Sequence, residues 1–443
     1  MKKPLVAPSF EDLLARTDAA RVVAILARAD VSASVDGRYC HWDSLRHKDP
    51  PGDLSSEEWW LGIKFLRQQM AQPTDLKDGR GRPFALAMVS PLLAGLRHVD
   101  QHASGHITVS EQVTNPDTRR SYLVSSLIEE AITSSQLEGA TTSRHVAKEM
   151  LRSGRNPNSR SEQMIVNNYR AMNYVRDHRD HDLTVDMVLD LHRIVTAQTL
   201  DDPSASGRLQ QPDEERIGVF DDEGALLHAP PPAEELPDRL EAMCAFANQA
   251  DTDGEFLHPV LRSIILHFWL GYDHPFEDGN GRTARALFYW SMLRRGYWLT
   301  EYLTISAILK NAPAKYARSF LYTEQDSNDL TYFLLYQLEI VRRAIDGLHD
   351  YLARKMQEVR STERLLRDTD LNHRQVALLA HALRTPGAQY TFRGHAASHA
   401  VVYQSARSDL LDLEQRGLLG KRKSGRAFVF LPARDLASQL QSV

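Results

Sequence analysis

The sequence predicts a mainly α-helical protein. An all-helical core carries one small β-hairpin, and a small domain of helices with a second hairpin follows it. Apolar residues recur with the helical period through most of residues 116–366, and strand–turn–strand patterns occur only near 216–227 and 418–431. Residues 371–434 hold ten Lys or Arg and three Asp or Glu, a net charge of +7. Because the whole chain of 443 residues has a net charge of −5, the remainder has −12, which indicates a separate basic domain.

Three regions follow one another along the chain. Residues 1–115 contain helical stretches such as 55–70, separated by loops with Pro and Gly, and we expect this region, with Trp59 and Trp60, to pack on the core. Residues 116–366 form the core, and residues 371–435 form the C-terminal domain. Within the core, helices are predicted at 121–139, 162–178, 184–198, 233–248 and 331–366, the last of which leads into the C-terminal domain.

The most informative segment is a polar turn, HPFEDGNGRTAR, that runs from His274 to Arg285. The residues before it, 257–272, have the apolar period of a buried helix, with Pro259 suited to the first turn. The residues after its start, 281–295, predict a second helix that Gly296 ends. The turn therefore leads into a helix N-terminus, where free N–H groups and the helix dipole favour an anion.

Four residues of this turn suit a phosphate ligand. Gly279 and Gly281 allow the backbone to approach a phosphate without a Cβ in the way. Arg282 and Arg285 lie three positions apart on one helical face, where both can bind further phosphate oxygens.

Two more residues add reactivity to the anion site. Asp278 supplies the kind of oxygen ligand that Mg²⁺ prefers. His274 is the residue of the turn that exchanges a proton near neutral pH. Together the residues predict transfer of a phosphate-containing group from a Mg²⁺-bound nucleotide to a nucleophile that the histidine activates.

The turn resembles the signature of the Fic family, HxFx(D/E)GNGRxxR, with every fixed position matched. Members of that family mostly transfer AMP from ATP to a hydroxyl side chain of a protein. The resemblance implies an all-helical Fic fold, ATP and Mg²⁺ as ligands, and a target protein that offers a Ser, Thr or Tyr hydroxyl. It assigns His274 as the base that deprotonates this hydroxyl and Asp278 as the Mg²⁺ ligand.

The resemblance assigns the remaining fixed positions to nucleotide binding and to packing. Phe276 would lie in the core and hold the loop. Arg282 and Arg285 would contact the outer phosphates. A hole for the α- and β-phosphates would be formed by Gly279, Asn280 and Gly281.

A second motif lies upstream, where residues 121–137 predict a helix that ends in SSQLEG. Ser134 and Glu138 share a helical face, and Gly139 stands where a helix stops. A carboxylate at a helix C-terminus is unfavourable unless a cation is near. The segment resembles the Fic inhibitory motif, (S/T)xxxE(G/N), which implies that Glu138 pairs with Arg285 and blocks productive binding of the last phosphate. The alternative is a surface glutamate ahead of a helix-stopping glycine.

A hairpin is predicted between the two motifs, with strands at 216–220 and 225–227 around a tip at 221–224. In Fic proteins a hairpin here, the flap, aligns the target segment by main-chain pairing. A plain surface hairpin is an equal alternative, because its side chains are not diagnostic.

Two histidines near the turn raise the question of a zinc hydrolase. His258 stands at a helix start, where it can cap or face solvent, and His267 has no HExxH spacing and no cysteine partner. The spacing therefore disfavours a zinc site.

The C-terminal domain has helices predicted at 372–384, 392–398 and 404–416, followed by a hairpin with the basic tip KRKSGR at 421–426. This order resembles a winged helix-turn-helix. The resemblance implies that duplex DNA binds here, with Gln404, Ser405 and Arg407 in the major groove and the basic tip on phosphates. The alternative is a solvated charged turn on a domain that docks on protein.

Two classes of function therefore compete. The first is an adenylyltransferase of protein hydroxyls that Glu138 inhibits; within it, transfer of UMP, phosphocholine or phosphate, or removal of AMP, stays open. The second is a DNA-binding transcriptional regulator whose helical body senses nucleotide or a partner.

Composition predicts a cytoplasmic protein. Cys40 and Cys244 are the only cysteines, so no disulfide framework is expected. The first residues lack the sustained apolar core of a signal peptide, and no apolar stretch is long enough to span a bilayer, so no membrane partner is expected. The oligomeric state stays open, with a homodimer as one option.

Overall fold

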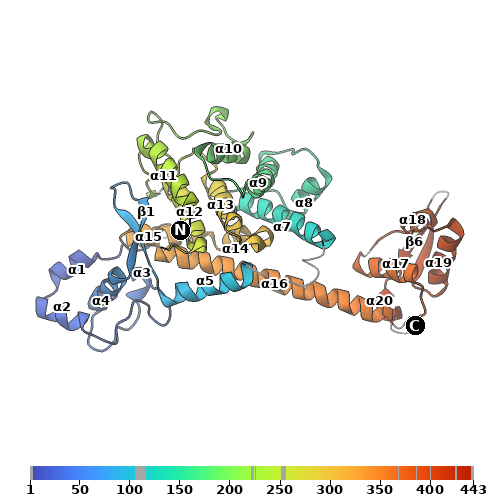
Figure 1. The fold of residues 1–443 in the computed structure, drawn as a ribbon, viewed down its shortest axis with the longest axis horizontal. Helices are drawn as coiled ribbons and strands as arrows, with labels where there is room; N and C mark the ends of the chain where they lie inside the picture. Colours follow the sequence, from blue (N-terminus) through green and yellow to red (C-terminus); the bar gives the residue numbers. More distant parts are fainter. Residues whose placement is uncertain are drawn as a thin grey trace. The chain divides into compact units, whose positions relative to one another are not determined.

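The fold was analysed in a computed structural model of the chain, which describes residues 3–104, 116–220, 224, 226–250, 256–367, 369–385, 387–399, 401–424 and 427–440. The chain forms two compact units, Met1–Leu348 and His349–Val443. The predicted fold class is confirmed, because the described chain is mainly helical and its sheets are three small antiparallel hairpins (Figure 1).

The first unit holds the N-terminal helices and the core. Its first part contains α1 (Phe10–Arg16), α2 (Ala19–Leu26), α3 (Trp42–Leu45), α4 (Ser56–Gln69), β1 (Ala71–Lys77), β2 (Pro83–Ala87) and α5 (Ser90–Ala103). The core follows with α7 (Pro116–Leu137), α8 (Arg144–Ser153), α9 (Arg160–Asp177), α10 (Val185–Thr196), β3 (Val219–Phe220), β4 (Leu226–His228) and α11 (Leu236–Asn248). It continues with α12 (Pro259–Asp273), α13 (Asn280–Arg294), α14 (Ile305–Lys310), α15 (Pro313–Gln325) and α16 (Thr331–Arg367), the last of which runs on into the second unit.

The centre of the core is the helix pair α12 and α13, which pack on each other. Pro259 occupies the first turn of α12, as predicted, and His258 caps it by accepting the Val260 N–H. Almost every residue of both helices is buried, and α9, α10 and α11 pack around them (Figure 1). The loop between them therefore stands on a rigid base.

The N-terminal helices share an apolar cluster of their own. Ser55 and Glu58 form a capping box at the start of α4, which fixes the predicted helix start. Trp59 and Trp60 are both buried, and the Trp60 indole donates to the Pro8 carbonyl at 3.1 Å. Both tryptophans serve packing, but their apolar neighbours are other residues of the N-terminal helices rather than the core.

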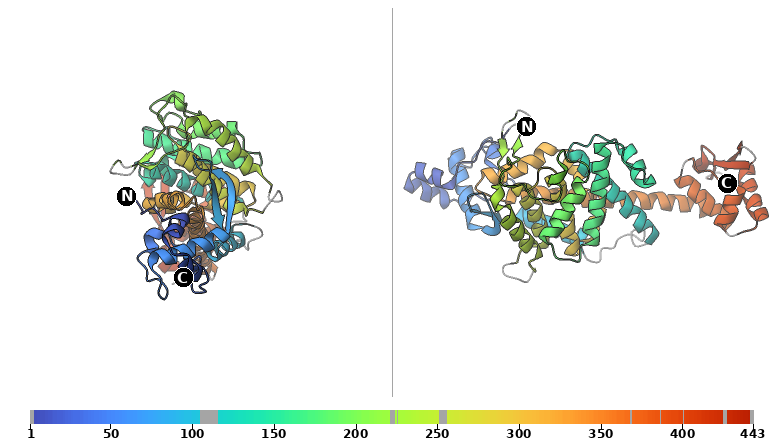
Figure 2. Two further views of the ribbon diagram at one scale, coloured as in Figure 1. Left: turned by 90° about the vertical axis from the view of Figure 1, so that its left-hand side faces the viewer. Right: turned by 90° about the horizontal axis from the view of Figure 1, so that it is seen from above.

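The hairpin of β1 and β2 was not predicted from the sequence (Figure 2, left view, the adjacent blue strands). Strand β1 reads AQPTDLK, where proline and polar residues hide the two-residue alternation. Its partner β2 supplies the buried Phe84 and Leu86. Asp78 closes the turn by accepting the N–H groups of Arg80 and Arg82, each at 2.9 Å.

The second unit contains a three-helix cluster and a hairpin. Its elements are α17 (His373–Arg384), α18 (Phe392–Ser398), α19 (Tyr403–Gln415), β5 (Leu419–Ser424), β6 (Ala427–Pro432) and α20 (Leu436–Leu440). The three helices lie within one residue of the predicted bounds, and β5 pairs with β6 without interruption from Leu419↔Pro432 to Ser424↔Ala427. Of the predicted basic tip, Gly425 and Arg426 lie outside the described residues. Within the described segments, no helix has both the length and the apolar composition needed to cross a bilayer.

Candidate functional site

The loop between α12 and α13 is braced from within. At its start His274 adopts a left-handed backbone with φ 45°, which ends α12. The Asn280 side chain accepts the Phe276 N–H at 3.0 Å and donates to the Phe276 carbonyl at 2.7 Å. Phe276 is fully buried, as the sequence analysis expected. Asn280 therefore fixes the turn through its side chain, in addition to the backbone that it contributes to the start of α13.

His192 on α10 packs against the loop and bonds it. It was not predicted from the sequence. Its ring stacks on Phe276 with centroids 3.7 Å apart. Nδ1 accepts the Gly207 N–H at 3.0 Å, so Nε2 carries the proton and donates to the Asp278 carbonyl at 2.8 Å. Burial, which disfavours the charged ring, lowers the pKa of His192 to about 4. His192 is thus a neutral support for the loop.

His274 is held in its neutral form. Burial, followed by the charge of nearby His228, lowers the pKa of His274 to about 4. The Arg216 guanidinium holds the backbone around it by donating to the carbonyls of Asp273 at 2.8 Å and His274 at 3.2 Å. The imidazole is therefore neutral at physiological pH and free to accept a proton.

Arg282 and Asp278 are both residues of the predicted anion site, and they contact each other. The side chain of Arg282 is fully buried, where it donates to the Val195 carbonyl at 3.1 Å and pairs with Asp278 at 3.1 Å. The Asp278 side chain is 43% exposed, so its carboxylate remains accessible to a cation. The first N–H groups of an α-helix such as α13 have no partner within the helix.

Arg285, by contrast, is held by the end of α7. Its guanidinium pairs with Glu138 at 2.8 Å and donates to the Ser134 hydroxyl at 2.9 Å and the Ser134 carbonyl at 3.1 Å. Helix α7 ends at Leu137, Gly139 has φ 92°, and the Ala140 N–H bonds the Ser135 carbonyl. This stop places the Glu138 carboxylate beside the first turn of α13. The two motifs, 147 positions apart in the sequence (285 minus 138), thus meet through one ion pair.

Gly281 leaves the space that this carboxylate occupies. A Cβ at position 281 would lie 2.3 Å from Glu138 Oε1 and 3.1 Å from Arg285 Nη1. Arg285 Nη1 is buried and makes no hydrogen bond within the described part of the chain. An anionic oxygen other than that of Glu138 would find the same space and the same cation.

A cavity of about 240 Å³ adjoins this ion pair. Its lining includes Glu138, His274, Asn280 and Gly281, together with Val219, Leu227 and His228 from the region of the predicted hairpin. That hairpin is confirmed as β3 paired with β4, although Asp221, Asp222, Glu223 and Ala225 of its tip and second strand lie outside the described residues. Phe220 and Leu226 are exposed, at 59% and 46%.

The two other histidines serve structure. His258 caps α12 and contacts Asp100 at 3.0 Å, and His267 bonds the Tyr316 hydroxyl at 2.7 Å while fully buried. Among the described residues no cluster of three or more His, Cys, Asp or Glu is placed to hold a metal ion.

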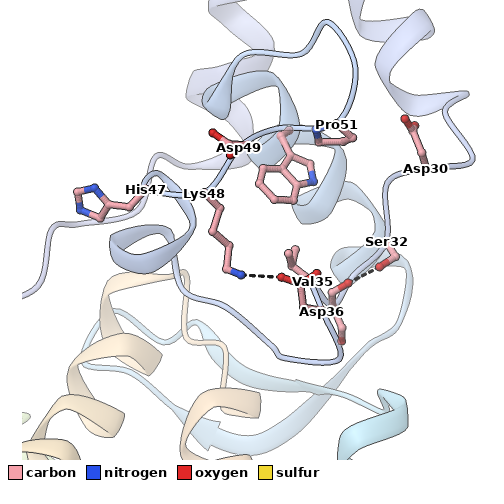
Figure 3. A pocket seen from close by; sticks show the side chains of 10 residues that line it. Asp30, Ser32, Val35, Asp36, His47, Lys48, Asp49 and Pro51 are labelled. Carbon is pink, nitrogen blue, oxygen red and sulfur yellow. Dashed lines mark hydrogen bonds and ion pairs between the residues drawn. The ribbon is translucent and has the colours of Figure 1, made fainter.

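A second hollow, of about 550 Å³, lies in the N-terminal helices (Figure 3). Two of its carboxylates are already paired: Lys48 points at Asp36, with 2.7 Å between nitrogen and oxygen, and Asp30 pairs with Arg28 at 2.6 Å. None of its lining residues belongs to the loop or to α7, so the candidate site is the cavity beside His274.

The structure therefore brings together every predicted site residue. His274, Asp278, Gly279, Asn280, Gly281, Arg282 and Arg285 share the loop and the first turns of α13, and Ser134 and Glu138 reach Arg285. The sequence analysis missed His192, Arg216 and His228. None of them lies in a motif at fixed spacing from the loop, so the sequence held no local signal for them.

Comparison with known proteins supports the family resemblance. Residues 182–292 match the model of the Fic/DOC family. The chain is 32% identical to protein adenylyltransferase Fic of Nematostella vectensis over 130 residues, which is 29% of this chain and 27% of that protein. It is 32% identical to protein adenylyltransferase fic-1 of Caenorhabditis elegans over 120 residues, 27% of this chain and 21% of that protein. The chain thus spans about a quarter of the length of these curated relatives.

The fold itself has a solved counterpart. A Fic family protein from Desulfovibrio desulfuricans G20 matches 79% of this chain and 98% of its own, with a TM-score of 0.54 and 19% sequence identity. This likeness shows a shared fold over most of the chain.

Proposed function

We propose that this protein, through the Fic/DOC domain at residues 182–292, is an adenylyltransferase that transfers AMP from ATP to a Ser, Thr or Tyr hydroxyl of a target protein. The observation that carries the proposal is the ion pair between Arg285 and Glu138, set beside His274. The pair gives the buried arginine its anionic partner and accounts for the carboxylate that stands at the end of α7, on the wall of the cavity.

The reaction follows from the positions of the groups. His274 Nε2 or Nδ1 takes the proton of the target hydroxyl, and the hydroxyl oxygen forms a bond to the α-phosphorus of ATP. The bond between that phosphorus and the oxygen bridging to the β-phosphate breaks, and pyrophosphate leaves. The N–H groups at the start of α13, with Arg282, stabilise the negative charge on the phosphates. The exposed flap residues Phe220 and Leu226 suit contact with a target segment.

The residues present fit Mg²⁺ as well as ATP. The half-exposed Asp278 carboxylate is the oxygen ligand that would hold the ion. A phosphate oxygen could reach the buried, unbonded Arg285 Nη1 beside Gly281 once it replaces the Glu138 carboxylate. When bound, Mg²⁺ supplies neutralisation of the phosphate charge.

Regulation follows from competition for Arg285. Burial opposes the charge of Arg285, but Glu138 outweighs it and raises the pKa of the arginine, so the cation must keep an anionic partner. The outer phosphate of ATP must replace Glu138 there. If the pair is worth about 1.4–3 kcal/mol, it suppresses productive binding by roughly 10–150-fold.

The decisive experiment measures covalent incorporation of α-labelled ATP with Mg²⁺ in the parent, Glu138→Gly, Arg285→Ala and the double variant. We expect Glu138→Gly to raise labelling by at least roughly tenfold, the low end of that range. Arg285→Ala added to Glu138→Gly should cancel much of the gain. Equal labelling in the parent and Glu138→Gly would mean that Glu138 is only a surface residue before a helix-stopping glycine. A γ-labelled ATP control, which should leave no label, separates AMP transfer from phosphate transfer.

A second function is favoured by the C-terminal unit, whose residues 371–435 we propose to be a winged helix-turn-helix domain that binds duplex DNA. Gln404 and Arg407 are exposed near the start of α19, and Lys421, Arg422 and Lys423 are exposed along β5. An exposed basic strand beside an exposed polar helix start is the surface that phosphate and groove contacts require. The cytoplasmic location and homodimerisation stay predictions.

A further inference from the structure

His228, the last residue of β4, is bonded at both ring nitrogens to oxygen atoms. Its Nε2 lies 2.7 Å from the Tyr272 carbonyl oxygen, and its Nδ1 lies 2.8 Å from Glu324 Oε2. A carbonyl oxygen only accepts, and so does an ionised carboxylate. Both contacts are hydrogen bonds at once only if both nitrogens carry protons, so the geometry favours an imidazolium. The side chain is 8% exposed, so water does not replace either partner.

This ring joins three elements around the cavity. It belongs to the flap strand β4, it bonds the last turn of α12 two residues before His274, and it pairs with α15 through Glu324. Its face lies against the Tyr272 ring, with centroids 4.9 Å apart. The backbone that carries His274 and the flap edge are therefore tied to the same side chain.

The charged groups around His228 are unevenly placed. On α15, Glu324 is its direct partner; on α12, Asp273 is already neutralised by Arg239 at 2.6 Å, and His274 shares the cavity with it. Arg216 holds the carbonyls of Asp273 and His274, and Glu138 lines the opposite wall. A positive charge on His228 is therefore paired with Glu324, and it disfavours a second positive charge on nearby His274.

We propose that His228 is a positioning residue for the transfer reaction: it stays doubly protonated, holds the flap to the end of α12 and, together with burial, disfavours a charge on the His274 imidazole. The positioning role rests on the proposed function. The protonation state of His228, by contrast, can be measured without any enzyme activity. Burial alone would lower the pKa of His228, but Glu324 and the Tyr272 carbonyl outweigh it and raise the pKa. The neighbouring cation in turn disfavours a proton on His274.

The first experiment is an NMR titration of the full chain with ¹⁵N-labelled histidine, the His228 and His274 signals being assigned from His228→Gln and His274→Ala. We expect both His228 nitrogens to be protonated at pH 7, and His274 to stay neutral down to at least about pH 5, below the ordinary histidine value near 6.5. In His228→Gln the His274 midpoint should move up by about one pH unit, the order of a close like-charge interaction. A singly protonated His228 at pH 7, or an unchanged His274 midpoint, overturns the proposal.

A second test variant and a matched control check this result. Glu324→Gln keeps the shape of the contact but removes the carboxylate, so His228 should lose its charge and the His274 midpoint should again rise. His258→Gln removes a histidine that also contacts a carboxylate, Asp100, but lies outside the cavity, and the His274 midpoint should not move.

The second experiment measures labelling against pH in Glu138→Gly with and without His228→Gln. If the charge of His228 matters, the acidic midpoint of the rate profile should shift to higher pH in the double variant. If His228 is merely structural, the rate should fall equally at every pH. A uniform loss overturns the electrostatic part of the proposal. If no variant incorporates label at all, the proposed transfer function fails, and the NMR titration still decides the state of His228.

Discussion

His274 and His228 both line the cavity beside the ion pair, but both ring nitrogens of His228 are bonded to protein oxygens. His192 and His267 also bind neighbouring protein groups. We therefore expect His274→Ala, made in the Glu138→Gly background, to lower covalent labelling by about 10²–10⁴-fold, the usual cost of losing a general base. Binding of Mg²⁺ and ATP should be largely intact, because the phosphates are held by other groups. Labelling assays and calorimetry measure the two quantities.

The matched control is His258→Gln in the same background, since His258 caps α12 at the end far in sequence from the loop. Its labelling should equal that of Glu138→Gly. Labelling by His274→Ala within a few-fold of the background would remove His274 from the role of base.

At the residue scale, the sequence predicted those site residues that lie close together in one short segment or at a recognisable helix end. His274, Asp278 and the two arginines stand in one short segment, and Glu138 stands at a recognisable helix stop. It did not predict His192, Arg216 and His228, because each reaches the loop from a distant element through a carbonyl oxygen. Every residue type has a backbone carbonyl, so contacts to carbonyls depend on the folded backbone and cannot be recognised in the sequence.

At the scale of elements, helices were predicted well where caps and apolar period agree. Ser55, Asn372 and Gly139 mark ends that the structure reproduces, and the hairpin of β5 and β6 was predicted from a basic segment between apolar residues at 418–419 and 427–431. The hairpin of β1 and β2 was missed because its strand β1 carries polar residues and Pro73, and its pairing depends on the buried β2. Tertiary packing decided that element, as it often does for edge strands.

Asp409 on α19 is the polar centre of the second unit, and its removal gives an element-scale prediction. It accepts from Arg374 at 2.7 Å and Asn372 at 2.8 Å, and His395 contacts it at 3.1 Å, so it joins α17, α18 and α19. Burial alone would raise the pKa of Asp409, but these partners lower it to about 2. We expect Asp409→Asn to destabilise these helices by about 1–3 kcal/mol at pH 7, measured by hydrogen exchange of the α19 amides.

The pH dependence gives the check. Because the folded pKa lies below the unfolded value of about 3.9, the stabilisation is complete above that value and is lost as the pH falls from about 4 through about 2. The gap between parent and variant should therefore shrink in acid. Asp370→Asn removes a 71% exposed partner of Arg416 and should have little effect at either pH. A gap that is constant with pH would show that the carboxylate charge is not what joins the helices.

At the scale of the whole molecule, charge separates the two functions that we propose. The segment 371–434 has a net charge of +7 in a chain of −5, so attraction to DNA depends on local rather than net charge. We expect the full chain to bind duplex DNA with an affinity that falls steeply with salt. Replacing Lys421, Arg422 and Lys423 with alanine should flatten the slope of log K against log salt by roughly one unit per lost phosphate contact.

The control replaces three exposed basic residues of the first unit, Arg46, Arg80 and Arg152, with alanine, which makes the same change in net charge. Its salt slope should match that of the parent in fluorescence anisotropy titrations. Absence of binding even at low salt would favour docking of the second unit on a protein.

The burial of Arg285 has a consequence for the lifetime of the protein. The side chain is only 1% exposed, so its charge needs a counterion whether or not nucleotide is bound, and Glu138 serves as that counterion in the empty protein. A chain that loses Glu138 leaves this charge uncompensated, at a cost that is a sizeable part of the roughly 5–15 kcal/mol that stabilises a typical fold. The unfolded fraction rises, and proteases remove it continuously. On the proposed function, a mutation that frees the enzyme would also shorten its life, so the fold itself limits how much unregulated enzyme can accumulate.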